Sequence, residues 1–96
     1  MITLEKLQTE YRDQILEIAT LCNAERIRVF GSVVRGDNHE GSDVDFLVHM
    51  KPNSGFCIGG LQWRLEDLLH CSVDIVSDAS LNSLIKDKIL SEAREL

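Results

Sequence analysis

Three short segments with the residue pattern of β-strands constrain the fold of this chain most strongly. They are Arg26–Phe30, Asp43–Met50 and Ser72–Val76, each rich in β-branched or aromatic residues. Longer segments with apolar residues at helical spacing lie before, between and after them. Short strands must be covered by helices to bury an apolar face. The pattern therefore predicts a small α/β (α+β) domain. We expect a three-stranded mixed sheet, helices packed mainly on one side, and the order α-β-β-α-β-α.

The three predicted helices differ in how clearly the sequence defines their ends. The first spans Thr3 to Ala24, with Asn23 as a stop signal. The second spans Phe56 to His70. Two consecutive glycines near its start would each cost about 1 kcal/mol in a helix, so we expect regular helix only from Leu61. The third spans Leu81 to Glu95, capped by Asp78 or Ser80, and its apolar residues are Leu81, Leu84, Ile85 and Ile89.

Composition excludes several classes of function. The 96 residues suffice for one domain with one core, which we assign to residues 1–96. The net charge of −6 argues against direct binding of a nucleic-acid backbone, because such binding depends on clustered Lys and Arg. No apolar run approaches the ~20 residues of a membrane helix. Charges begin at Glu5 without an apolar leader, so we expect no secretory signal, no membrane association and a cytoplasmic location.

Aspartates on two of the predicted strands are the first candidates for chemistry. Asp43 and Asp45 stand at alternate positions of one strand, so their side chains share a face. Asp74 on the third strand could join them if it faces the same way. Carboxylate oxygens are the ligands that Mg²⁺ prefers in proteins. The simpler interpretation is that Asp43 and Asp45 are solvated edge residues, although Asp is depleted in strands.

A glycine-serine pair after the first strand is the second candidate. Gly31 allows a close approach of the backbone to an anion, and Ser32 adds a hydroxyl donor. Arg35, three residues later, could reach the same anion. The alternatives are a plain strand-to-helix turn with a serine N-cap, and an arginine paired with Asp37 or Glu40.

Taken together, these residues resemble the signature of a known family. Gly31-Ser32, Arg35-Gly36 and Gly41-Ser42-Asp43-Val44-Asp45 form a G-S-x(10)-D-x-D pattern, and Val73–Val76 resembles the third acidic strand. The pattern is similar to that of the DNA polymerase β-like nucleotidyltransferase superfamily. The short length is similar to its minimal nucleotidyltransferase (MNT) group.

The resemblance implies roles for these positions. Asp43, Asp45 and Asp74 would be the catalytic residues and would bind two Mg²⁺ ions. The nucleotide, with ATP as the substrate, would be held by Gly31, Ser32, Arg35 and Ser42. Two cations can stabilise the entering and leaving oxygens of an in-line displacement, and they would allow a chain of charge −6 to accept a triphosphate.

The same resemblance implies a biological role. Many MNT proteins are antitoxins of HEPN-domain toxins, and they transfer AMP to a tyrosine of that partner. Two alternatives remain open. One is a non-catalytic antitoxin that neutralises its partner sterically. The other is the catalytic subunit of an enzyme that nucleotidylates a small molecule.

Overall fold

A four-stranded sheet with the strand order β3-β2-β1-β4 organises the computed structural model, which describes residues 1–96. The strands are β1 (Ala24–Phe30), β2 (Val44–Met50), β3 (Val73–Ser77) and β4 (Arg94–Glu95). β1 runs antiparallel to β2 and to β4, whereas β2 and β3 are parallel. The three predicted strands are confirmed to within two residues. The mixed sheet has a fourth strand that was not predicted, because two residues are too few to show a period.

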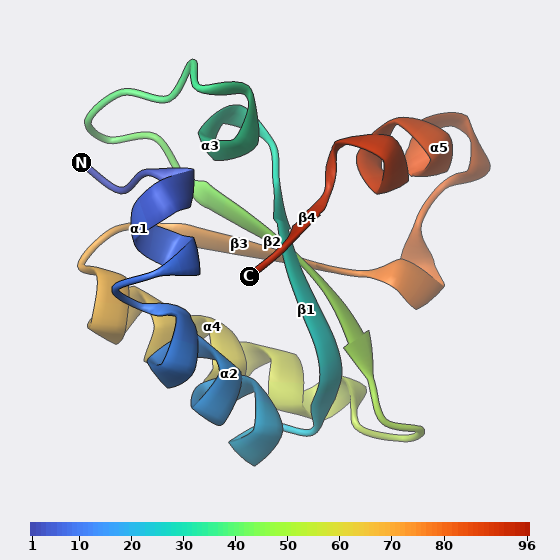
Figure 1. The fold of residues 1–96 in the computed structure, drawn as a ribbon. Coiled ribbons are helices and arrows are strands. Elements are labelled where there is room, and N and C mark those ends of the chain that lie inside the picture. The colour runs from blue at the N-terminus through green and yellow to red at the C-terminus, as the bar shows by residue number, and fades with distance from the viewer.

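Five helices surround this sheet. They are α1 (Leu4–Gln8), α2 (Arg12–Leu21), α3 (Ser32–Arg35), α4 (Ile58–Leu69) and α5 (Ser83–Glu92). Short 3-10 turns at Gly55–Cys57 and Asp78–Ser80 lead into α4 and follow β3. Figure 1 shows α2 and α4 together on one side of the sheet, while α5 lies on the other side, beyond β4. No helix combines the length and the apolar character that crossing a membrane requires.

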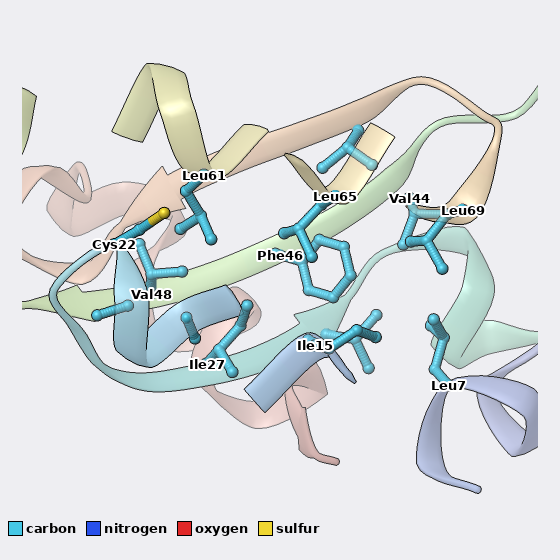
Figure 2. Close-up of a cluster of buried hydrophobic side chains, with 14 of the residues drawn as sticks. Leu7, Ile15, Cys22, Ile27, Val44, Phe46, Val48, Leu61, Leu65 and Leu69 are labelled. Atoms are coloured by element: carbon cyan, nitrogen blue, oxygen red, sulfur yellow. The ribbon is translucent and has the colours of Figure 1, made fainter. Parts of the chain in front are cut away.

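The core lies between the sheet and the pair α2 and α4. Phe46 of β2 is fully buried, between Leu65 of α4 and Ile15 of α2 (Figure 2). Val44 and Val48 flank Phe46 on the same face of the strand and are also buried. Alternation along β2 therefore turns Asp45 toward the opposite face, away from this core.

The first helix was predicted to be continuous from Thr3 to Ala24, and that prediction is wrong. The hydroxyl of Thr9 donates to the carbonyl of Glu5 at 2.7 Å, and α1 ends there. A threonine hydroxyl that bonds to the carbonyl four residues earlier destabilises and bends a helix. Leu7 of α1 and Ile15 of α2 are both fully buried in the core. The predicted stop at Asn23 is confirmed, since this residue has a φ of 64° directly after α2.

The second helix begins earlier than the glycines suggest. α4 starts at Ile58 and contains Gly59 and Gly60, both exposed. Its opposite face buries three leucines, and packing of an apolar face stabilises a helix more than residue propensity does. The prediction that regular helix starts only at Leu61 is therefore wrong by three residues.

The last helix differs most from its prediction. α5 spans Ser83–Glu92, and its N-cap is Asn82, whose Oδ1 accepts from the backbone N–H of Leu84 at 2.8 Å. Neither Asp78 nor Ser80 caps it. No residue of α5 is buried, and Leu84 is 89% exposed. The core face of the sheet is already covered by α2 and α4, so the apolar residues of α5 do not reach it.

Candidate functional site

Asp45 of β2 and Asp74 of β3 are paired directly across the parallel strands. On the other side of Asp45, its partner on β1 is Phe30. Paired positions of a sheet project their side chains to the same face. Asp45 and Asp74 therefore share the face that points away from the core, which is the arrangement a joint metal site requires.

Asp43 lies one residue before β2, in the segment that enters the strand. The pKa of Asp45 is raised to about 6 by burial first, and then by the negative charges of Asp74 and Asp43. Asp74 and Asp43 are therefore close enough to Asp45 to repel its carboxylate. In a protein without cations, this repulsion favours the protonated form of Asp45.

Gly31 forms the turn between β1 and α3. Its φ is 81°, in the region that L-residues with a side chain avoid. A Cβ at this position would collide with the Oδ2 atom of Asp45. The backbone of Gly31 is thus packed against the carboxylate, and only glycine fits. Gly31, not Ser32, is the N-cap of α3, so the alternative of a serine cap is not what the structure shows.

Arg35 ends α3 and points to the last residue of α5. Its Nη1 donates to both carboxylate oxygens of Glu92, at 2.9 and 3.0 Å. Its Nε donates to Asp37 at 3.2 Å. Hydrogen bonds to Glu92 and Asp37 raise the pKa of the guanidinium group. The pairing with Asp37 that the alternative interpretation named is present, and Glu92 is the partner that connects Arg35 to the cleft.

A cleft of about 310 Å³ lies among these groups, but Asp43 is not part of its lining. Four of the predicted site residues line it, namely Gly31, Arg35, Asp45 and Asp74. The remaining lining residues were not predicted as site residues, and all but one come from α5: Phe30, Ile85, Lys88, Ile89 and Glu92. The sequence contains no local motif that would have identified them, because only the fold brings α5 to this face.

Two predicted nucleotide-binding residues lie outside the cleft lining. Ser42 lines a separate hollow of about 370 Å³ beside α1 and the end of α4. Its hydroxyl accepts from the backbone N–H of His39 at 2.9 Å and thereby closes the loop before Asp43. Ser32 is the first residue of α3 and is partly exposed next to Gly31.

The carboxylates have the chemistry of a cation site but do not form a closed cage. No three His, Cys, Asp or Glu side chains converge closely enough to hold an ion by themselves. Mg²⁺ in phosphate-transferring sites is usually bound by one or two carboxylates, with water and substrate phosphates completing its shell. The open pair of Asp45 and Asp74, with Asp43 nearby, fits such a partial ligand set.

Comparison with known proteins places the chain in a family. A model of the nucleotidyltransferase domain matches residues 6–96. The chain belongs to the nucleotidyltransferase domain family. This nucleotidyltransferase is 37% identical, over 96% of its length and 94% of the relative's, to the protein adenylyltransferase MntA of Thermococcus cleftensis.

Solved structures show the same fold. One structure, provisionally described as a minimal nucleotidyltransferase, is 38% identical with a TM-score of 0.85, over 99% of this chain and 97% of that one. A chain in the complex of a tri-AMPylated Shewanella oneidensis HEPN toxin with its MNT antitoxin has a TM-score of 0.68 at 18% identity. That alignment covers 92% of this chain and 70% of that one. The resemblance to the minimal nucleotidyltransferase group is thereby confirmed.

Proposed function

We propose that this nucleotidyltransferase transfers AMP from ATP to a hydroxyl group, a tyrosine or another, of a HEPN-domain partner, and acts as its antitoxin. The observation that carries the proposal is the direct pairing of Asp45 and Asp74 beside the backbone of Gly31. The likeness to a protein adenylyltransferase at 37% identity supports AMP as the transferred group. The fold shared with a chain in the complex of an AMPylated HEPN toxin with its MNT antitoxin supports the class of partner.

The proposed reaction is one in-line displacement at the α-phosphorus of ATP. The hydroxyl oxygen of the partner forms a bond to that phosphorus, and the bond from the phosphorus to the oxygen that bridges to the β-phosphate breaks. Pyrophosphate leaves with that oxygen. The hydroxyl proton passes to the carboxylate of Asp74, which is exposed to an incoming acceptor.

The other residues bind and orient the nucleotide. Asp43 and Asp45, with Asp74, would hold the two Mg²⁺ ions. The backbone N–H of Gly31 and the hydroxyl of Ser32 would donate to the β- and γ-phosphates, and Arg35 would neutralise part of their charge. Ser42 would act from the loop that leads to Asp43. Transfer of this type needs mainly positioning and neutralisation of charge from the protein.

When bound, divalent cations supply the positive charge that stabilises the entering and leaving oxygens. The chain itself cannot supply it, because its net charge is −6 and the carboxylates at the site repel a triphosphate. This charge balance supports a requirement for Mg²⁺.

Transfer of label from α-³²P-ATP in the presence of Mg²⁺, with the product of the adjacent gene as acceptor, tests the proposal. We expect label on the acceptor with the unmodified chain and its loss with Asp45→Asn. Asp67→Asn is the matched control. It removes an exposed carboxylate from α4, on the other side of the sheet, and we expect it to transfer normally.

Other outcomes of this experiment would assign a different function to the chain. A stable complex that neutralises the partner without any label would indicate a steric antitoxin. Label that appears on a small molecule but not on the partner would indicate the small-molecule enzyme. Transfer that survives in Asp45→Asn would remove the aspartates from the mechanism.

A further inference from the structure

Glu92 occupies the donors that the proposed function assigns to the nucleotide. Its Oε1 accepts from the backbone N–H of Gly31 at 2.6 Å. Both of its oxygens accept from Arg35. A carboxylate resembles the terminal oxygens of a phosphate in charge and in its capacity to accept hydrogen bonds. Gly31 has a single N–H, which cannot serve Glu92 and a phosphate at full strength together.

The side chain of Glu92 is more buried than its position at the end of an exposed helix would suggest. Its side chain is only 15% exposed, although the helix it ends has no buried residue. It adds a negative charge to the same cleft lining that contains Asp45 and Asp74. A carboxylate is therefore held next to other carboxylates, and the compensating partners are Arg35 and the N–H of Gly31.

The helix α5 also limits the space at the site. It supplies Ile85, Lys88 and Ile89 as one wall of the cleft. The cleft volume of about 310 Å³ is at the lower end of the ~300–1,000 Å³ typical of ligand pockets. The chain beyond α5 is fixed, because β4 pairs with β1 and the carbonyl of Glu95 accepts from Gln8 at 2.8 Å. No residue of the helix itself is buried, so little packing holds it in place.

We propose that Glu92 is an internal competitor of the nucleotide: its carboxylate occupies the phosphate donors in the free protein and leaves Gly31 when a triphosphate binds. The inference rests on the proposed function, since it takes Gly31 and Arg35 as phosphate ligands. It adds that the affinity for nucleotide is set by the release of Glu92. Any partner that draws α5 away from the cleft would then strengthen nucleotide binding.

Calorimetric titration with a non-hydrolysable ATP analogue and Mg²⁺ tests the competition. We expect Glu92→Ala to bind the analogue about tenfold more tightly than the unmodified chain, as when a state populated at ~10% becomes the dominant one. Glu92→Gln keeps the shape without the charge and should bind with intermediate affinity. Asp87→Ala is the matched control, because it removes an exposed carboxylate from α5 that does not line the cleft.

A second measurement needs no ligand. The amide proton of Gly31 should resonate downfield in the unmodified chain, because it donates to a carboxylate, and should move upfield in Glu92→Ala. Weaker or unchanged binding in Glu92→Ala would overturn the competition and make Glu92 a residue that orients Arg35. If Asp87→Ala also binds the analogue more tightly, and by the same factor, the gain comes only from the change in net charge, and the competition is overturned too.

The failure of the proposed function gives a different pattern. If neither the unmodified chain nor either Glu92 variant binds the analogue while the Gly31 resonance still moves, the nucleotide site is wrong and the competition falls with it. If the unmodified chain binds and transfers label but Glu92→Ala binds no more tightly, only the competition is wrong.

Discussion

Asp45 and Asp74 face each other across β2 and β3 because Val44 and Val73, the preceding residues, are paired in the core. Both valines are nearly fully buried. In each strand the buried residue fixes which way the next side chain points. The placement of the two carboxylates thus depends on the same contacts that stabilise the sheet.

The raised pKa of Asp45 predicts a dependence of stability on pH. The folded chain binds this proton with a pKa of about 6, whereas the unfolded chain releases it near 3.8. Between about pH 4 and pH 6 the folded state therefore holds more protons, so the free energy of unfolding falls as the pH rises through this window. Asp45→Asn should remove this loss of stability, because asparagine does not titrate. At pH 8 in EDTA it should be more stable than the unmodified chain by about 1–2 kcal/mol, allowing for solvent screening of a partly exposed group.

Urea denaturation at pH 4 and pH 8 measures this difference. Asp67→Asn, at an exposed position of α4, should track the unmodified chain at both pH values. Equal stability of Asp45→Asn and the unmodified chain at pH 8 would contradict the prediction, and so would a larger gain at pH 4 than at pH 8.

Gly31→Ala should impair the site more than the fold. The added methyl group would collide with Oδ2 of Asp45, and alanine would be strained at a φ of 81°. The ψ of Gly31 is −152°, a region that almost only glycine adopts, and strain of this kind costs about 1–3 kcal/mol. We expect melting temperature to fall moderately and transfer of label to be lost. Gly36→Ala is the control for a positive φ: its φ is 80° with a ψ of 14°, and nothing lies within 4 Å of its added methyl group. Equal losses of transfer in both variants would refute a role for the contact with Asp45.

Substitutions of Arg28 and of Asp78 should have unequal effects on the free energy of unfolding. Arg28 is 9% exposed, its Nε has no hydrogen-bond partner, and its Nη2 lies 3.8 Å from Asp78. Removing the carboxylate with Asp78→Ala leaves a buried charge with less compensation, and should cost about 1–3 kcal/mol. Arg28→Met should be nearly neutral, because it removes the buried charge while Asp78, which is 24% exposed, keeps its hydrogen bonding with Nδ1 of His49 at 3.0 Å. Chemical denaturation of the two variants checks the order, and a larger loss in Arg28→Met would contradict it.

Two leucines distinguish the helix that builds the core from the helix that borders the site. Leu65 of α4 is fully buried, whereas Leu84 of α5 is 89% exposed. Leu65→Ala should destabilise the chain by about 2–5 kcal/mol through the cavity it leaves. Leu84→Ala should change the free energy of unfolding by less than about 0.5 kcal/mol. A large loss in Leu84→Ala would mean that α5 is packed in solution, which denaturation curves of the two variants would reveal.

Local pattern was sufficient to predict the strands, and alternation around Phe46 assigns Asp45 to the face away from that side chain. Whether Asp74 faces the same way stayed open in the sequence, because it depends on the pairing of β3 with β2, which only the fold gives. The same reasoning failed for α5. Its apolar residues predict that one face of the helix is buried, but they do not show which part of the protein that face would pack against. Glu92 could not be predicted from pattern, since its contacts to Gly31 and Arg35 bridge about sixty residues of sequence.

The pairing of Val44 with Val73 has a consequence for how activity can be lost. A slip of β3 by one residue would place Val73 or Ile75 opposite Asp45 and turn Asp74 toward the core. Such a slip would bury a carboxylate and expose a valine, so misregistered molecules should be unstable as well as inactive. A folded sample should therefore contain only molecules in which β2 and β3 are correctly aligned. If a soluble, folded sample is inactive, the defect lies in the cleft and not in the pairing of the strands.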